Sequence, residues 1–173
     1  MRHLLLISAA ALLAAPVAAQ EAAATFIDAN GAEAGMVSLV QQGDSVAITG
    51  EVAGISPGPH GIHFHQTGDC DASNAFESAG SHFNPADHQH GLENPDGPHA
   101  GDLPNIEAGE DGTVAIDLTS DRISLVEGEE GYVFDEDGTA LVIHAGEDDQ
   151  VTDPSGNSGD RIACAVIEAT PAS

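Results

Sequence analysis

The sequence contains no lysine and only three basic residues, the arginines Arg2, Arg122 and Arg161, against 29 acidic residues. Its formal net charge at pH 7 is −26 when histidine is counted as neutral. This shortage of cations disfavours binding to nucleic acid or to anionic membranes, because both present negative charge. The calcium-loop pattern D-x-[DN]-x-[DN]-G is also absent. We therefore interpret the carboxylates as a solvated acidic coat and expect neither nucleic acid nor a membrane as a partner.

Long hydrophobic runs are absent beyond the N-terminus. The run Leu4–Leu13 is apolar but too short to span a bilayer, and it follows a short positive start. Val17–Ala19 matches the small-residue rule for a secretory cleavage site. This pattern predicts a signal peptide over residues 1–19 and one exported domain over residues 20–173. An uncleaved membrane anchor is the alternative.

Cysteine is scarce, since Cys70 and Cys164 are the only two. In an exported protein two cysteines are expected to form one disulfide. It would close a loop of roughly 95 residues, and the lost chain entropy of the unfolded state gives about 4–5 kcal/mol of stabilisation. The alternative is a pair of thiolate metal ligands, although neither cysteine belongs to a C-x-x-C pair.

Helical periodicity is nearly absent beyond residue 19, and short β-type runs recur between Gly, Pro, Asn and Asp. Ser45–Val52 and Thr113–Leu118 alternate apolar with polar or small residues, which is the period of a half-buried antiparallel strand. Strands are predicted over Ala24–Asp28, Met36–Gln42, Ser45–Val52, Gly61–His65, Thr113–Leu118, Thr139–His144 and Arg161–Glu168. Seven or eight such strands predict an all-β domain, either a sandwich or a small barrel.

Two long stretches, 66–112 and 145–160, show no strand pattern. Loops beyond ~12–15 residues are uncommon in compact domains unless they are functional. Most of the histidines lie in the first stretch or next to one of the two. We therefore predict two long functional loops that depend on metal coordination for their order.

His63 and His65 form an H-x-H pair inside a predicted strand. Alternation along a strand places both imidazoles on one face, while Ile62 and Phe64 point to the core from the other. The Cβ atoms of the two histidines are then ~6.5–7 Å apart, so both rings can reach one ion. His144 ends another predicted strand and could approach the same ion from a neighbouring position.

A second group of candidate ligands lies in the first long loop, and comprises His82, His90, His99 and Asp102. Three imidazoles and one carboxylate make a closed tetrahedral zinc set, which indicates a structural zinc. All the candidates together are too many for one four-coordinate ion and suit two ions, with or without a shared ligand. Imidazole binds both copper and zinc, and copper in one of the sites would make the chemistry redox.

Two other histidines are not predicted to be ligands. His88 lies between stronger candidates, and we expect it to be exposed to solvent. His60 precedes the H-x-H strand, and we expect it to support the structure or the ligands.

Ordered motifs along the chain resemble the copper/zinc superoxide dismutase family in its exported bacterial form. These motifs are Gly61–His65, Ser78–Pro85, His90–Gly91, Pro98–Asn105, Leu141–His144 and Gly159–Cys164. The resemblance runs from about residue 30 to the C-terminus, and it implies a flattened Greek-key β-barrel. It further implies a periplasmic location, with an extracellular one as the alternative, and leaves open whether the protein is a monomer or a homodimer.

The resemblance implies one copper ion and one zinc ion per subunit. The implied copper ligands are His63, His65, His82 and His144. The implied zinc ligands are His82, His90, His99 and Asp102. His82 would bridge the two ions as an imidazolate.

The resemblance also assigns roles outside the ligand set. Cys70 and Cys164 match the family's intrasubunit disulfide. Asp148 matches a carboxylate that orients one ligand histidine of each metal, with Asp149 as a close competitor for that role. Arg161 matches the arginine that guides the anionic substrate to copper.

The implied reaction is the copper-dependent disproportionation of superoxide to dioxygen and hydrogen peroxide, with His82 as a proton donor. Two other functions are weighed against it. One is a non-enzymatic copper and zinc binding or storage module on the same fold, which loss of a copper histidine or of Arg161 would favour. The other is a zinc-only structural domain for adhesion or partner binding, which would leave His63, His65 and His144 unexplained.

Overall fold

Residues 20–170 are described by the computed structural model, so the predicted signal peptide at residues 1–19 lies outside the described residues. The described part contains ten strands and two short 3-10 helices, which confirms the all-β prediction. The strands are β1 (Glu21–Asp28), β2 (Glu33–Gln42), β3 (Ser45–Ala53), β4 (Gly58–His60), β5 (Ile62–His65), β6 (Ile106–Ala108), β7 (Thr113–Ser120), β8 (Ala140–His144), β9 (Arg161–Val166) and β10 (Glu168–Ala169). The 3-10 helices are η1 (Ala72–Asn74) and η2 (Glu77–Ala79). Among the described residues, no helix is long and apolar enough to cross a membrane.

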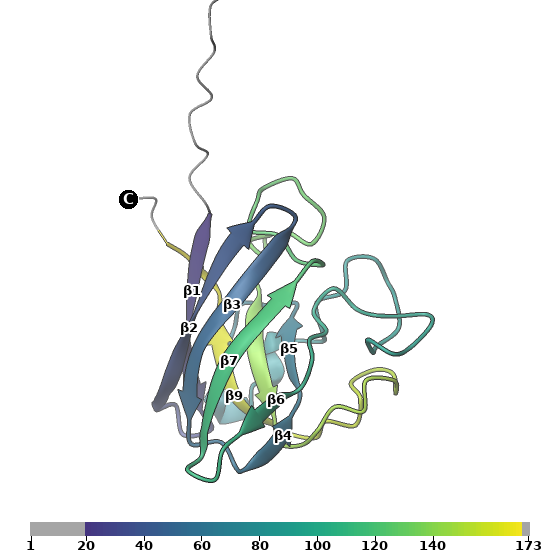
Figure 1. Ribbon diagram of the computed structural model, residues 1–173. Helices are drawn as coiled ribbons and strands as arrows, with labels where there is room; N and C mark the ends of the chain where they lie inside the picture. The colour runs from purple at the N-terminus through teal and green to yellow at the C-terminus, as the bar shows by residue number, and fades with distance from the viewer. Residues whose placement is uncertain (1–19, 171–173) are drawn as a thin grey trace, which may run out of the picture.

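One curled antiparallel sheet forms most of the molecule (Figure 1). Its strand order is β5-β8-β9-β1-β2-β3-β7, and β10 also pairs with β1. The chain passes from β3, near one end of this order, by way of β4 to β5 at the other end, and later returns from β7 to β8 beside β5. These crossing connections agree with the predicted Greek-key barrel.

The concave face of the curled sheet encloses the hydrophobic core. Along β3, Val46, Ile48 and Val52 are fully buried, while Thr49 and Glu51 between them are exposed. This is the alternation that the sequence predicts for a half-buried strand, and it is confirmed.

Two paired strands near the corner of the barrel were not expected from the sequence. β4 and β6 form a small antiparallel sheet of their own, with Gly58 opposite Ala108. The Gly58-Pro59 dipeptide is typical of a turn, and Pro is tolerated here because the sheet has only two strands, each with a free edge. The expectation that residues 66–112 contain no strand is therefore wrong at Ile106–Ala108.

Several predicted strands have different ends in the structure. β1 begins at Glu21 rather than Ala24, and β2 begins at Glu33 rather than Met36. Alanine and glycine have little intrinsic preference for strands, but here they are included because the ladder continues through them, as in the pairing of Ala22 with Leu39.

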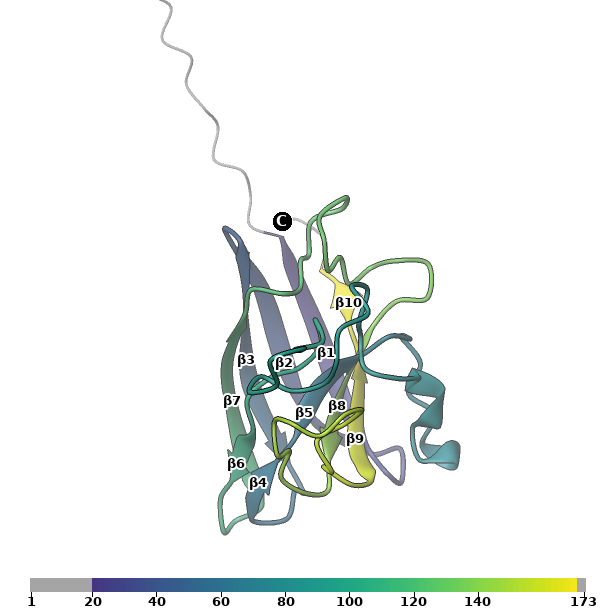
Figure 2. The same cartoon turned by 90° about the vertical axis from the view of Figure 1, so that its right-hand side faces the viewer.

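Both long loops project on the side of the barrel that carries β5 and β8 (Figure 2). The second loop, 145–160, contains neither strand nor helix. The first loop folds back on β5 through two isolated bridges, from His63 to Asp102 and from His65 to His82. These contacts bring the loop histidines to the strand histidines.

Candidate metal centre

The pair of strands β5 and β8 supports the centre. All four residues of β5 are buried, and Ile62 and Phe64 belong to the main hydrophobic cluster. Their burial fixes the opposite face of the strand, from which His63 and His65 extend. β8 pairs with β5, and the backbone N–H of His144 donates to the carbonyl of Gly61 at 2.9 Å. His144 is thereby placed beside the H-x-H pair.

Four buried histidines form the first group of donors. His63, His65, His82 and His144 each contribute one atom to a set that lies within 4.8 Å. Nδ1 of His63 and Nε2 of the other three are buried without a hydrogen-bond partner. A buried polar atom without a partner costs about 1–3 kcal/mol, so four of them in one place indicate a site built for a bound cation.

The second nitrogen of each of these rings has a partner. His65 Nδ1 donates to the carbonyl of Gly80 at 2.9 Å, and His144 Nδ1 donates to the carbonyl of Gly159 at 3.1 Å. These bonds place the proton on Nδ1 and leave Nε2 with a free lone pair. Fixing the tautomer and ring orientation in this way is typical of metal-binding histidines.

Asp102 is the centre of the second group. Its Oδ1 lies 3.0 Å from Nδ1 of His82, 3.0 Å from Nδ1 of His90 and 3.3 Å from Nδ1 of His99. Its Oδ2 accepts hydrogen bonds from the backbone N–H groups of Gly91 and His99. The carboxylate is thus held by the backbone and faces three imidazole nitrogens, as expected for a zinc set.

His63 also lies near this second group. Donor atoms of His63, His82, His90 and Asp102 lie within 4.8 Å of one another. His99 Nδ1 lies 3.4 Å from His82 Nδ1. Distance alone therefore leaves both His63 and His99 as candidates for the fourth place, and their hydrogen bonds are needed to separate them.

Asp148 connects the two groups. Its Oδ2 accepts a hydrogen bond from His63 Nε2 at 2.6 Å, and its Oδ1 lies 3.0 Å from His90 Nε2. The neighbouring Asp149 is exposed, and its Oδ1 accepts from two backbone N–H groups of its own turn. Of the two aspartates that the sequence offers, Asp148 is the one that lies between the groups.

Burial keeps the first group neutral in the metal-free chain. It lowers the pKa of His82 to about 4 and that of His144 to about 3, and it holds the pKa of His65 well below its usual 6.5. Neutral imidazole is the form that binds a metal, so little proton competition is expected at this group near pH 7.

His90 behaves differently because it lies between two carboxylates. Burial alone would lower its pKa, but hydrogen bonds with Asp102 and Asp148 outweigh burial and raise the pKa to about 9. The same bonds hold the pKa of both carboxyl groups below the usual range, although burial acts in the opposite direction. The metal-free second group therefore holds a proton on His90 at neutral pH.

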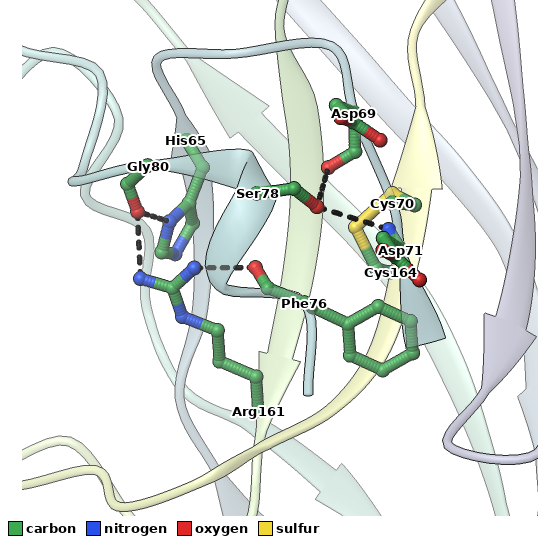
Figure 3. The surroundings of a disulfide bond; sticks show 9 residues. All are labelled: His65, Asp69, Cys70, Asp71, Phe76, Ser78, Gly80, Arg161 and Cys164. Atoms are coloured by element: carbon green, nitrogen blue, oxygen red, sulfur yellow. Dashed lines mark hydrogen bonds between the residues drawn. A yellow bond between two sulfur atoms is a disulfide. The ribbon is translucent and has the colours of Figure 1, made fainter. Parts of the chain in front are cut away.

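Arg161 is the first residue of β9 and lies near His65 of the first group (Figure 3). It is partly buried, and its two terminal nitrogens donate to the carbonyls of Phe76 and Gly80, both at 2.6 Å.

Cys70 and Cys164 form a disulfide near Arg161. This confirms the predicted disulfide and excludes the alternative of two thiolate metal ligands.

Within residues 20–170, the remaining histidines, His60 and His88, lie outside both groups. His88 is exposed, and its Nδ1 donates to the carbonyl of Pro98 at 3.1 Å. His60 is buried between two backbone carbonyls, those of Ser56 and His144, each 2.7 Å away. Its contact with His144 gives it the supporting position that the sequence predicts.

Several residues around Asp148 were not identified from the sequence. The side chain of Asn105 forms hydrogen bonds with the backbone of Asp148. The backbone N–H of Gln150 donates to Asp148 Oδ1 at 2.6 Å. Gly156 packs so closely that a Cβ there would lie 1.7 Å from Asp148 Oδ1. The Gly and Asn residues of the loops are typical of turns, so no local pattern separates these from the others.

The fold and the two groups together define an antiparallel β-barrel protein with two adjacent candidate metal sites. Residues 33–167 match the family described as copper/zinc superoxide dismutase (SODC). The chain is 42% identical over 146 residues to superoxide dismutase [Cu-Zn] 1 of Aquifex aeolicus, covering 84% of this chain and 86% of that protein. It is also 42% identical over 141 residues to superoxide dismutase [Cu-Zn] of Caulobacter vibrioides, covering 80% of each. The chain belongs to the copper/zinc superoxide dismutase family, a family of oxidoreductases.

A solved structure of a SOD-like protein from Bacillus subtilis is similar as well. Its TM-score is 0.80 at 38% sequence identity, with 83% of this chain and 96% of that one covered. The names of the relatives thus include dismutases and a protein described only as SOD-like. Membership of the family therefore leaves the activity of a given chain to be argued from its own ligands.

Proposed function

We propose that this chain, as an exported domain over residues 20–173, disproportionates superoxide to dioxygen and hydrogen peroxide in antioxidant defence. The observation that carries the proposal is the convergence of four buried, unpartnered imidazole nitrogens in the first group. A storage module or a zinc-only domain would not need this complete set together with an arginine beside it.

The first group would hold one copper ion through His63 Nδ1 and the Nε2 atoms of His65, His82 and His144. Imidazole-only donor sets suit copper, whereas a set that adds one carboxylate to imidazoles suits zinc better. Bound copper would supply the one-electron redox couple that the reaction requires. Hydrogen bonds keep the rings of His63, His65 and His144 each in one tautomer, so these three ligands need not rearrange between the two half-reactions.

The second group would hold one zinc ion through the Nδ1 atoms of His82, His90 and His99 and through Asp102. We prefer His99 to His63 because His63 Nε2 is committed to Asp148 at 2.6 Å, while His63 Nδ1 belongs to the first group. His82 would then serve both ions, one with each nitrogen.

His82 is suited to deliver a proton to the product. Its Nδ1 faces Asp102 at 3.0 Å, while its Nε2 is the unpartnered atom of the first group. Whenever Nε2 is not bound to the ion, it could hold a proton and pass it to peroxide, while Nδ1 keeps the ring in place. Two superoxide ions and two protons give one dioxygen and one hydrogen peroxide, so one proton per cycle can come from His82.

Arg161 would attract the anionic substrate to the first group. It is one of two arginines among residues 20–170, and its guanidinium is fixed by two carbonyls rather than by a carboxylate. Its positive charge is therefore not neutralised by a direct ion pair, which leaves it available to superoxide.

Export to the periplasm is part of the proposal, with secretion from the cell as the alternative. The signal-peptide pattern of residues 1–19 and the disulfide both support export, because disulfides persist in oxidising compartments. The chain would act as a monomer or as a homodimer.

The proposal is tested by measuring superoxide decay after loading with copper and zinc, with the content of each metal quantified. We expect fast decay that is lost on removal of copper, and loss of copper with His144→Ala. His88→Ala serves as the matched control, because His88 is exposed and lies outside both groups. Full occupancy of both sites without catalysis would instead support a metal-binding or storage role. Binding of zinc alone would support a structural domain.

A further inference from the structure

The side-chain amide of Asn105 bonds both backbone groups of Asp148. Asn105 Oδ1 accepts from the backbone N–H of Asp148 at 2.9 Å, and Asn105 Nδ2 donates to its backbone carbonyl at 2.8 Å. Both polar groups of one amide are thus used on a single residue 43 positions away in the sequence. We call this two-bond contact the Asn105 clasp.

The position of Asp148 matters because its carboxylate touches one histidine of each group. It lies 2.6 Å from His63 Nε2 and 3.0 Å from His90 Nε2. Asp148 is on the loop 145–160, which has no regular secondary structure to fix its backbone. An aspartate side chain is short, so a small shift of this backbone would withdraw the carboxylate from one ring or the other.

Asn105 is well placed to prevent such a shift. It follows Asp102 by three positions in the first loop, and Leu103 between them is fully buried. The clasp therefore ties the loop that carries the second group's carboxylate to the loop that carries Asp148. Other contacts act on the Asp148 carboxylate itself, such as the N–H of Gln150 at 2.6 Å, whereas the clasp fixes its main chain.

We propose that Asn105 is a positioning residue for the second metal group, which acts through Asp148 and sets the affinity for zinc. The inference rests on the proposed function only in taking the second group to be the zinc site. Residues that orient metal ligands commonly contribute 10- to 100-fold to affinity. The side chain of Asn105 bonds Asp148 rather than a metal ligand, so we expect its contribution to zinc affinity to lie at the lower end of that range.

The test compares zinc affinity by equilibrium competition against a chromophoric chelator, using the disulfide-bonded protein with copper bound. Asn105→Ala is expected to weaken zinc binding about tenfold. Asn157→Gly is the matched control, because Asn157 lies in the loop that carries Asp148 but donates to Asp149, and its positive φ of 54° suits glycine. That control should bind zinc as the unchanged protein does.

A double-mutant cycle separates positioning from a general structural effect. If Asn105 acts through Asp148, Asn105→Ala should have little further effect on zinc affinity once Asp148→Ala is present. Independent, additive losses would overturn the proposal, as would zinc binding by Asn105→Ala within twofold of the unchanged protein. Should Asn105→Ala not fold, Asn105→Ser retains one short polar group and should weaken zinc binding in the same direction.

Superoxide decay of the unchanged, fully loaded protein is recorded in the same series. Absence of that activity would contradict the proposed function, while the zinc competition would still test the clasp. Full activity combined with an unchanged zinc affinity in Asn105→Ala would contradict the clasp alone.

Discussion

His65 and Arg161 share one hydrogen-bond acceptor, the backbone carbonyl of Gly80 (Figure 3). The imidazole donates to it from Nδ1 at 2.9 Å, and the guanidinium donates from Nη2 at 2.6 Å. A single carbonyl therefore sets the orientation of a proposed copper ligand and the position of the charge beside it. The substrate-guiding role proposed for Arg161 would depend on this arrangement.

Replacing Arg161 should lower the rate without removing the metals. We expect Arg161→Ala to reduce kcat/KM about tenfold, because loss of a local positive charge weakens steering of the anion. Arg161→Lys should reduce kcat/KM by a smaller factor, because lysine keeps the positive charge but cannot form both hydrogen bonds to the two carbonyls in the same geometry. Stopped-flow superoxide decay at matched copper content provides the measurement. Equal kcat/KM for all three proteins would contradict a guiding role.

The acidic surface should make the reaction respond to salt in an unusual direction. Superoxide is an anion, and a protein with a formal charge of −26 repels it at long range. Salt screens this repulsion to about 8 Å at physiological ionic strength. We therefore expect kcat/KM to rise or stay level as the ionic strength increases from a low value. A steep fall would show that attraction by Arg161 dominates the field.

Reduction of the disulfide should affect both stability and activity. The bond joins residues separated by 94 positions, and its loss should lower the free energy of unfolding by about 4–5 kcal/mol. It also anchors the segment with Phe76 and Gly80, whose carbonyls hold Arg161. Urea unfolding and superoxide decay, measured on oxidised and reduced protein, give both results. A reduced protein with unchanged kcat/KM would show that this segment keeps its place without the bond.

The metal-free chain should lose stability in acid from pH 6.5 downward. His82 and His144 have pKa values of about 4 and about 3 in the folded state, against 6.5 when unfolded. Below pH 6.5 the unfolded chain therefore binds protons at these two histidines that the folded chain does not bind. The free energy of unfolding falls as the pH decreases for this reason. Each group contributes at most about 1.4 kcal/mol per pH unit. Urea unfolding of the metal-free, disulfide-bonded protein from pH 7 to pH 4 measures this slope. His88→Ala, which changes an exposed histidine, should keep the slope, and a pH-independent free energy would contradict the expectation.

Local patterns in the sequence were sufficient to predict the strand that carries the H-x-H pair. Alternation in β5 requires Ile62 and Phe64 to share one face, and their place in the main hydrophobic cluster confirms that face as the core side. The same reasoning could not predict β4 and β6, because Gly58-Pro59 has the local chemistry of a turn. Their pairing is decided by the barrel's closure, which no short window of sequence contains.

The candidate site likewise contains residues that the sequence could predict and residues that only the folded structure could reveal. The histidines could be identified as a set because their residue type carries metal chemistry wherever it occurs. The role of Asn105 could not be identified, because an asparagine after a proline is usual in loops and its partner Asp148 is far along the chain. Long-range bonds between a side chain and the main chain leave no periodic trace in a sequence, so the folded structure is needed to find them.

The Asp148 carboxylate gives the two proposed sites a shared energetic dependence. An ion that fixes His90 also fixes Asp148, and through it His63 on the other side. Filling one site then removes part of the ordering cost of filling the other. Thermodynamic linkage makes this effect reciprocal, so the factor by which zinc strengthens copper binding must equal the factor by which copper strengthens zinc binding. Binding at either site would therefore lower the fraction of half-loaded molecules, by an amount set by this coupling factor.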